Sequence, residues 1–209
     1  MAAIVRTERA ERVFVSYHQL VVSDREYDEG HPDHSDDELA SSRPGIAVIW
    51  TGVHTGFLDV TIRLATAAPP MPRPGEWEEG TEVDLVTLTG ETVLCGLMGD
   101  PPAQFPDLTP QGPGRYRMRV HTRGRSLNNK AYGQVCPEVY VITIWPVDVG
   151  PGAAARYREM AAHEPPTRSD RLRAWAREQM MNEPGRPARR VKHDQPSSTA
   201  VQETSGATP

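Results

Sequence analysis

Residues 113–125 read Pro-Gly-Arg-Tyr-Arg-Met-Arg-Val-His-Thr-Arg-Gly-Arg, with a basic side chain on every second position from residue 115. The positions between them carry Tyr116, Met118, Val120 and Thr122. This period of two predicts a β-strand with one basic face and one largely apolar face, because a helix would distribute the arginines around its axis. The basic positions are Arg115, Arg117, Arg119, His121, Arg123 and Arg125.

The partner of this strand is predicted a few residues further along the chain. Residues 139–145, Val-Tyr-Val-Ile-Thr-Ile-Trp, are rich in β-branched and aromatic side chains. Residues 126–137 contain Asn, Gly and Pro and can return the chain for antiparallel pairing. The chain is therefore expected to be a β-protein built on this hairpin.

The composition favours an all-β fold. The 209 residues include 20 prolines and 17 glycines, which suits short strands joined by turns. We expect an antiparallel β-sandwich of about seven or eight strands over residues 12–148. A helical extension follows at 153–182, with helices expected at 153–162 and 169–181. Residues 183–209 have almost no large apolar side chains, and disorder is expected there.

Several strands and connections are predicted from local patterns. Residues 1–11 are polar, and we expect a frayed start that adds a helical turn. Residues 12–23 form one strand whose polar His18-Gln19 pair indicates a bulge or a passage between two sheets. Hairpins are expected between 46–50 and 57–65 and between 76–88 and 92–98, because glycine-bearing turns separate these apolar segments.

An acidic segment precedes the second predicted strand. The net charge of −5 conceals eight carboxylates and one arginine between Asp24 and Glu38, whereas the 115–125 strand is purely basic. The segment has three interpretations: a solvated loop, a divalent-cation site or a partner-binding surface. His31-Pro32-Asp33-His34 offers metal-ligand side chains, but its spacing matches no dedicated site and no metal is predicted.

No catalytic arrangement is visible. Cys95 and Cys136 lie in unrelated contexts, and no local signature joins either of them to a histidine. The chain has no glycine-rich phosphate loop and no HExxH motif. We expect neither an enzyme nor a bound cofactor. No signal peptide or long apolar run is present, so the cytoplasm is the expected compartment, without membrane attachment.

The basic strand has two interpretations. Its arginines either pair with carboxylates of a neighbouring strand, such as Asp59 or Glu138, and lie over aromatic rings, or they bind an acidic protein, DNA or RNA. Nucleic-acid binding usually places aromatic side chains on the same face, whereas Tyr116 lies on the opposite one.

The chain resembles the competence protein J family. The resemblance rests on Val-Phe-Val-Ser-Tyr-His-Gln-Leu-Val-Val at 13–22, Gly-Arg-Tyr at 114–116 and Glu-Val-Tyr-Val-Ile-Thr-Ile-Trp-Pro at 138–146. It covers about residues 12–148 and implies a small β-sandwich that inhibits a DNA-entry nuclease. The 114–125 stretch and the Ile-Trp-Pro ending are also similar to actinobacterial β-proteins of unknown function.

The function expected from these features is partner binding without catalysis. The acidic segment would occupy the basic active site of a nuclease and exclude its substrate. The alternatives are a nucleic-acid-binding domain that uses the basic strand and an interaction domain with another partner. The predicted partner-binding residues are Asp33, Asp36, Asp37, Glu38, Arg115, Arg117, Arg119, Arg123 and Arg125.

Overall fold

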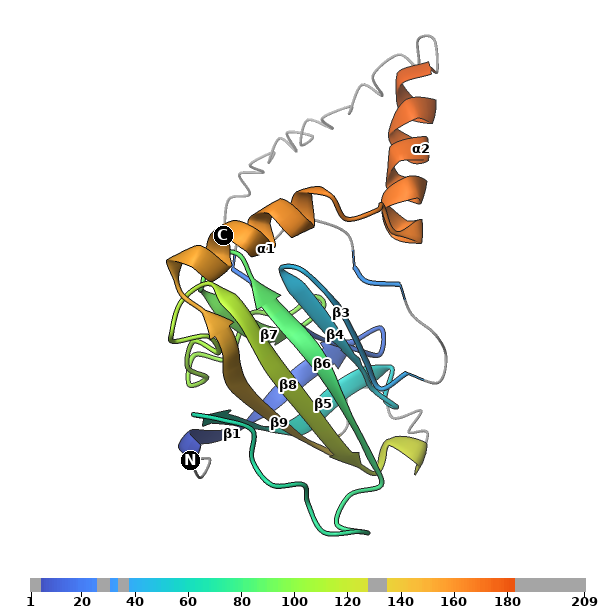
Figure 1. Ribbon diagram of the computed structural model, residues 1–209. Helices are drawn as coiled ribbons and strands as arrows, with labels where there is room; N and C mark the ends of the chain where they lie inside the picture. The colour runs from blue at the N-terminus through green and yellow to red at the C-terminus, as the bar shows by residue number, and fades with distance from the viewer. Residues whose placement is uncertain (1–4, 26–30, 34–37, 128–134, 183–209) are drawn as a thin grey trace, which may run out of the picture.

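The computed structural model describes residues 5–25, 31–33, 38–127 and 135–182 (Figure 1). This part of the chain contains nine strands, a short 3₁₀ turn and two α-helices. The strands are β1 (Val5–Ser16), β2 (Gln19–Asp24), β3 (Ala40–Arg43), β4 (Ile46–Trp50), β5 (Thr55–Ala65), β6 (Glu79–Thr87), β7 (Thr92–Gly96), β8 (Gly114–Arg123) and β9 (Val135–Val149). The turn is η1 (Arg125–Leu127), and the helices are α1 (Pro151–Ala162) and α2 (Arg168–Asn182).

The strands form one mixed sheet in the order β3-β4-β2-β1-β5-β9-β8-β6, and β7 pairs with β2 beside this path. β5 and β9 are parallel, and the other pairs are antiparallel. The two ends of the order approach each other, since the Gly45 N–H donates to the Val86 carbonyl at 2.7 Å. The sheet is thus barrel-like and nearly closed. The predicted predominance of β-structure is confirmed, but the predicted antiparallel sandwich is not.

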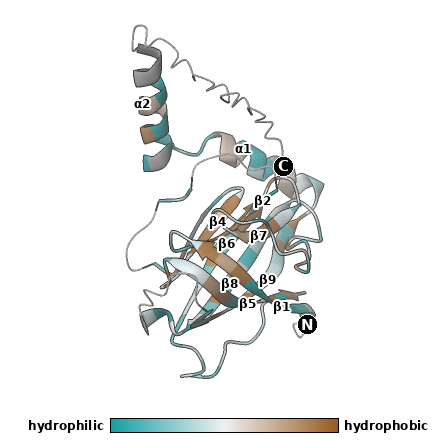
Figure 2. Cartoon of the chain, turned by 180° about the vertical axis from the view of Figure 1, so that it is seen from behind, coloured by the Kyte–Doolittle hydropathy of each residue, from teal (hydrophilic) through white to brown (hydrophobic). Residues whose placement is uncertain are grey.

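The apolar positions of the strands face the inside of this sheet. Met118 and Val120 of β8 are fully buried, together with Leu58 and Ile62 of β5 and Ile142 of β9. Figure 2 shows the hydrophobic residues, in brown, concentrated along the strands. The period-two pattern therefore correctly predicted β8 and its inward face. The antiparallel pairing of β8 with β9 is also confirmed, with Val120 opposite Ile142.

Residues 5–24 form two strands rather than one. Tyr17 and His18 have φ angles of 54° and 61° and make a two-residue turn between β1 and β2. Both φ angles are positive, as in the turns whose twist matches that of a hairpin. The bulge expected at His18-Gln19 was therefore wrong. The helical turn expected within residues 1–11 was also wrong, because β1 begins at Val5 and pairs with β5.

Two predicted hairpins are replaced by pairings with strands further away. β4 pairs with β2 and β3 instead of β5, and β7 pairs with β2 instead of β6. The turns at residues 51–54 and 88–91 therefore carry the chain between parts of the sheet that are not neighbours. Local turn signals fix where a strand ends, but they do not specify its partner.

The two helices lie close to the predicted ranges. Figure 1 shows α1 across one end of the sheet and α2 projecting away from it. α1 packs through Ala153, Ala154 and Tyr157, which are buried. Leu172 and Trp175 of α2 remain 56% and 60% exposed. No helix among the described residues has the length and hydrophobicity to span a membrane. The predicted disordered tail, 183–209, lies outside the described residues.

Candidate functional site

The basic row of β8 lies against an acidic row on β6. Glu82 is directly opposite Arg119, and Asp84 is opposite Arg117. Arg119 Nε lies 2.6 Å from Glu82 Oε1, and Arg117 Nη1 lies 3.0 Å from Asp84 Oδ1. Desolvation raises the pKa of Glu82, but hydrogen bonds from Arg119 and Arg117 outweigh it and leave this pKa below its usual value.

The outer members of the row are paired as well. Arg115 lies 3.7 Å from Asp84, and Arg125 lies 2.7 Å from Glu79. Of the partners named from the sequence, Asp59 was wrong, because it pairs with Arg12. Glu138 is buried.

Glu138 serves the interior of the fold. Its carboxylate accepts hydrogen bonds from the backbone N–H groups of Gly52 and Val53 at 2.6 and 2.8 Å, and from the Tyr140 hydroxyl at 2.7 Å. A buried carboxylate satisfied in this way holds the 51–54 turn against β9.

Arg119 and Arg123 also hold the segment between β5 and β6. Arg119 is 6% exposed and donates to the carbonyls of Pro69 and Pro70 at 3.0 and 3.1 Å. Its guanidinium lies 5.1 Å from the centre of the Trp145 ring. Arg123 lies 5.4 Å from the Trp77 ring centre and donates to the Glu76 carbonyl. These contacts stabilise the fold through hydrogen bonds and cation–π interactions.

The acidic segment is divided between structural and surface positions. Asp24 is buried, whereas Asp33 and Glu38 are exposed. The Asp33 carboxylate accepts a hydrogen bond from the Arg168 backbone N–H at 3.0 Å. Arg125 approaches the Glu38 carbonyl at 3.5 Å, so one end of the segment reaches the predicted basic set. Asp36 and Asp37 lie outside the described residues, as does His34.

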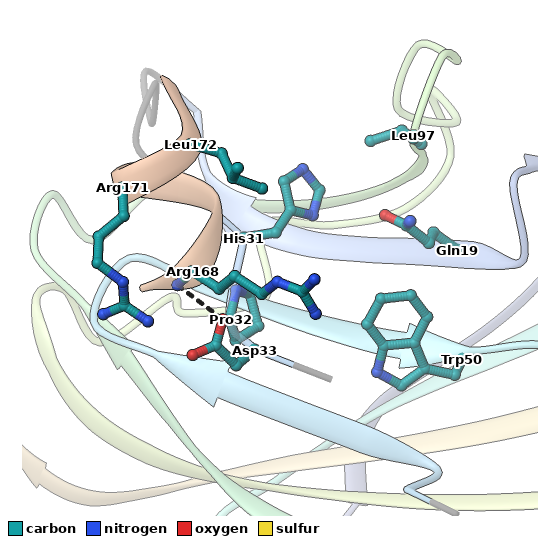
Figure 3. Close-up of a pocket in the computed structure, with 9 residues that line it drawn as sticks. All are labelled: Gln19, His31, Pro32, Asp33, Trp50, Leu97, Arg168, Arg171 and Leu172. Atoms are coloured by element: carbon teal, nitrogen blue, oxygen red, sulfur yellow. Dashed lines mark hydrogen bonds between the residues drawn. The ribbon is translucent and has the colours of Figure 1, made fainter. Parts of the chain in front are cut away.

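A groove opens beside Asp33, between α2 and the outer face of the sheet. Its volume is about 630 Å³. Figure 3 shows Trp50 and Leu97 on the sheet side and Leu172 on the helix side. Gln19 also lies on the sheet side, His31 lies between the two sides, and the Arg168 side chain points across the groove toward Trp50. The groove thus combines apolar walls with amide, imidazole and guanidinium groups.

The sheet is apolar on its outer face here as well as on its inner face. Val21 of β2 lies opposite both Val48 of β4 and Cys95 of β7. These residues form a second apolar cluster that includes Trp50 and Leu97. The continuous runs Leu-Val-Val at 20–22 and Ile-Ala-Val-Ile at 46–49 are typical of strands covered on both faces. These runs are the signal in the sequence that indicates a covered outer face at the groove.

A second hollow adjoins the groove. Its volume is about 590 Å³, and it shares Pro32, Asp33 and Arg171 with the first. Glu38, Ser41, Val83 and Thr167 are among its other lining residues. Asp33 and Glu38 therefore both line this second hollow, beside the start of α2. The described residues contain no cluster of three or more His, Cys, Asp or Glu side chains arranged to hold a metal ion.

The structure was compared with solved structures. The fold is similar to that of ComJ. ComJ from Bacillus subtilis is described as an inhibitor of the DNA degrading activity of NucA. The two structures superpose with a TM-score of 0.51 at 15% sequence identity, covering 69% of this chain and 99% of ComJ. At this identity the similarity establishes a ComJ-like fold and nothing about activity.

A second solved structure, described as Crocagin biosynthetic gene J, gives a TM-score of 0.40 at 16% identity. That match covers 67% of this chain and 98% of the other. Comparison of the sequence with models of protein families gives no match, and neither does comparison with curated proteins.

Proposed function

We propose that this protein is a non-catalytic binding module that inhibits a nuclease by occluding its active site. The observation that carries the proposal is the ComJ-like fold, which matches nearly the whole length of a nuclease inhibitor. The proposed compartment is the cytoplasm. Inhibition by occlusion needs one inhibitor for each nuclease, so at concentrations well above the Kd it should be nearly complete when the two proteins are equimolar.

The proposed contact surface is the segment from Asp33 to Glu38. Both end residues are exposed and face the depression beside α2, and Asp36 and Asp37 lie between them in sequence. A nuclease site that holds a polyanion is basic, so carboxylates that are close together in sequence attract it and compete with DNA. The basic row of β8 and the adjoining η1 gives less support to direct nucleic-acid binding, because Arg115, Arg117, Arg119 and Arg125 are paired with carboxylates.

The test compares three full-length baits in a pull-down from the native host. They are the wild type, a variant with Asp33→Asn, Asp36→Asn, Asp37→Asn and Glu38→Gln, and a control with Asp59→Asn, Glu76→Gln, Glu91→Gln and Glu159→Gln. The control removes the same number of charges from other parts of the surface. The wild type and the control should retain a nuclease and suppress its digestion of DNA.

The four-substitution variant should lose at least about tenfold in affinity for that nuclease, because several charge pairs across an interface are removed together. Recovery of the same partners from the variant and the wild type would refute the role of the acidic segment. Recovery of no nuclease by any bait would refute the proposed function. Nucleic acid bound to all three baits would favour a contact through another face.

A further inference from the structure

The groove beside α2 contains polar atoms that the fold leaves unpaired. Gln19 Oε1 and His31 Nδ1 are both buried and have no hydrogen-bond partner among the residues that the structure describes. Both residues line the groove, and both are labelled in Figure 3. Buried polar atoms without partners are rare in folded proteins because each forfeits its hydrogen bonds to water. Two of them in one groove indicate that a ligand supplies the missing partners.

The groove also carries arginines without ion pairs. Most arginines of the sheet pair with carboxylates, but within the described part of the chain Arg168 and Arg171 form no ion pair. The nearby Asp33 carboxylate is bound to the backbone N–H at the start of α2. A helix start favours a negative charge in this position, so Asp33 is already partly compensated. The two guanidinium groups therefore favour an anionic ligand.

The charge state of His31 fits the same interpretation. Desolvation, followed by the charge of Arg173, lowers the pKa of its imidazole below the usual value. The ring is therefore neutral at pH 7, and its unpaired nitrogen is suited to a neutral hydrogen-bonding group. Gln19 Oε1 needs a donor, which a bare carboxylate or phosphate lacks. A peptide backbone offers both N–H and C=O groups.

The shape of the depression favours an extended ligand. The groove of about 630 Å³ extends from Arg171 and Leu172 of α2 to Trp50 at the sheet. The apolar side chains of Trp50, Leu97 and Leu172 line one part of it. An extended peptide places successive side chains on opposite sides, so one can enter this apolar part while the next meets the arginines.

We propose that the groove between α2 and the outer face of β2, β4 and β7 binds an extended peptide segment of a protein partner. An apolar side chain of the peptide lies against Trp50, Leu97 and Leu172. An adjacent carboxylate lies beside Arg168 and Arg171, and the peptide backbone pairs with Gln19 and His31. This contact adjoins the proposed nuclease contact at Asp33. It differs from that contact because it recognises an acidic segment rather than a basic surface.

The test is an NMR titration of the ¹⁵N-labelled full chain, observed at the indole N–H of Trp50. The probe is the peptide acetyl-Ser-Leu-Glu-Leu-Glu-Ser-amide, and its comparison replaces both glutamates with lysine. The glutamate peptide should shift the Trp50 signal saturably, and the lysine peptide should bind at least about tenfold more weakly. The Trp50 signal is assigned by its loss in Trp50→Phe.

Two variants test the residues. Arg168→Glu with Arg171→Glu should weaken binding of the glutamate peptide by at least about tenfold, whereas the matched control Arg9→Glu with Arg177→Glu should not. Gln19→Leu should also weaken binding, by about tenfold, without lowering resistance to urea, because it removes an unpaired buried oxygen. A merely structural role for Gln19 would leave peptide affinity unchanged.

Several outcomes would overturn the proposal. They are the absence of a saturable shift, equal affinity for the two peptides, and unchanged affinity in Arg168→Glu with Arg171→Glu. A shift produced by hexanoate or by a single-stranded oligonucleotide, but not by the glutamate peptide, would assign the groove to another ligand. None of these outcomes bears on DNA digestion, so the nuclease proposal stands or fails separately.

Discussion

Asp24 is an acidic residue whose role is structural. Its side chain is 3% exposed and accepts hydrogen bonds from the hydroxyls of Thr87 and Thr92. It also accepts from the backbone N–H groups of Leu88 and Thr89 at 2.7 and 3.2 Å. One carboxylate therefore joins the end of β2 to the turn between β6 and β7. The sequence places Asp24 in the acidic segment, but the structure separates it from the exposed carboxylates.

Asp24→Ala should lower the free energy of unfolding by about 3 kcal/mol, because it leaves several buried donors without their charged acceptor. Urea denaturation at pH 7 measures the change. Asp59→Ala is the control, since its exposed pair with Arg12 should contribute less than about 1 kcal/mol. Equal effects of the two substitutions would contradict the structural role of Asp24.

His121 is a second residue with a specific environment. Its ring stacks on Trp77 at a centroid distance of 5.8 Å. The ring also lies close to Gly80. A Cβ added to Gly80 would be 2.7 Å from the Cδ2 atom of His121. Desolvation, then the charge of Arg119, lowers the pKa of His121, although Glu76 and Glu82 oppose this shift.

A lowered pKa in the folded state means that the unfolded chain binds a proton more readily. The free energy of unfolding should therefore fall as the pH decreases from 7 to 5, below the ordinary histidine pKa of 6.5. Urea denaturation at a series of pH values measures the slope. His121→Gln should flatten the slope, whereas an identical slope would show that His121 does not contribute.

At the scale of elements, α2 is attached to the sheet through Arg43 of β3. The Arg43 side chain is 8% exposed and lies 2.7 Å from Asp170 and 3.3 Å from Glu164. Hydrogen bonds from Arg43, and next from the Thr167 backbone, lower the pKa of Asp170 to about 2. The attachment is therefore fully formed above pH 3.8 and weakens as the pH falls toward 2.

Arg43→Gln should release α2 while leaving the sheet folded. Loss of a charged hydrogen-bonded contact of about 2 kcal/mol should speed hydrogen exchange of the α2 amides by roughly 30-fold. Exchange in β8 should not change. Arg177→Gln, on the exposed side of α2, is the control. Unchanged exchange in α2 of Arg43→Gln would show that other contacts hold the helix.

The elements differ in how well the sequence predicted them. β8 and β9 were predicted because alternation defined their faces and the chain returns directly between them. The pairing of β8 with β6 was missed, although Glu82 and Asp84 have the same spacing of two as Arg117 and Arg119. Charge patterns can therefore indicate a strand partner where turns do not.

The candidate site was only partly predicted. Asp33 and Glu38 were named as partner-binding residues, and both are exposed beside the groove and its neighbouring hollow. Their neighbourhood was not foreseen, because Asp33 and Arg168 are separated by most of the chain. A one-dimensional pattern reports the face of each element but not which distant faces meet.

At the scale of the whole molecule, β9 completes the sheet. It pairs with β5 on one side and with β8 on the other. Without it, β6 and β8 would lose their sheet connection to β1 and β5. The core would also lose Tyr140, Ile142 and Ile144, which are at most 1% exposed.

A chain ending at residue 134 should therefore fail to fold, whereas a chain ending at Asn182 keeps all described elements and should fold cooperatively. Thermal unfolding followed by far-UV circular dichroism and gel filtration distinguishes the two. The shorter chain should show no cooperative transition and should elute as an aggregate or an expanded species. A cooperative transition in the shorter chain would show that β9 is dispensable.

The central position of β9 also bears on how the protein is made. A ribosome synthesises β9 after every other strand of the described sheet, so the nascent chain exposes the edges of β5 and β8 until residue 149 has emerged. Such edges pair readily with other chains, and contacts distant in sequence form slowly. Translation delivers the strand that joins the two parts of the sheet last, so the interval before its release is when a chaperone would protect the chain most effectively.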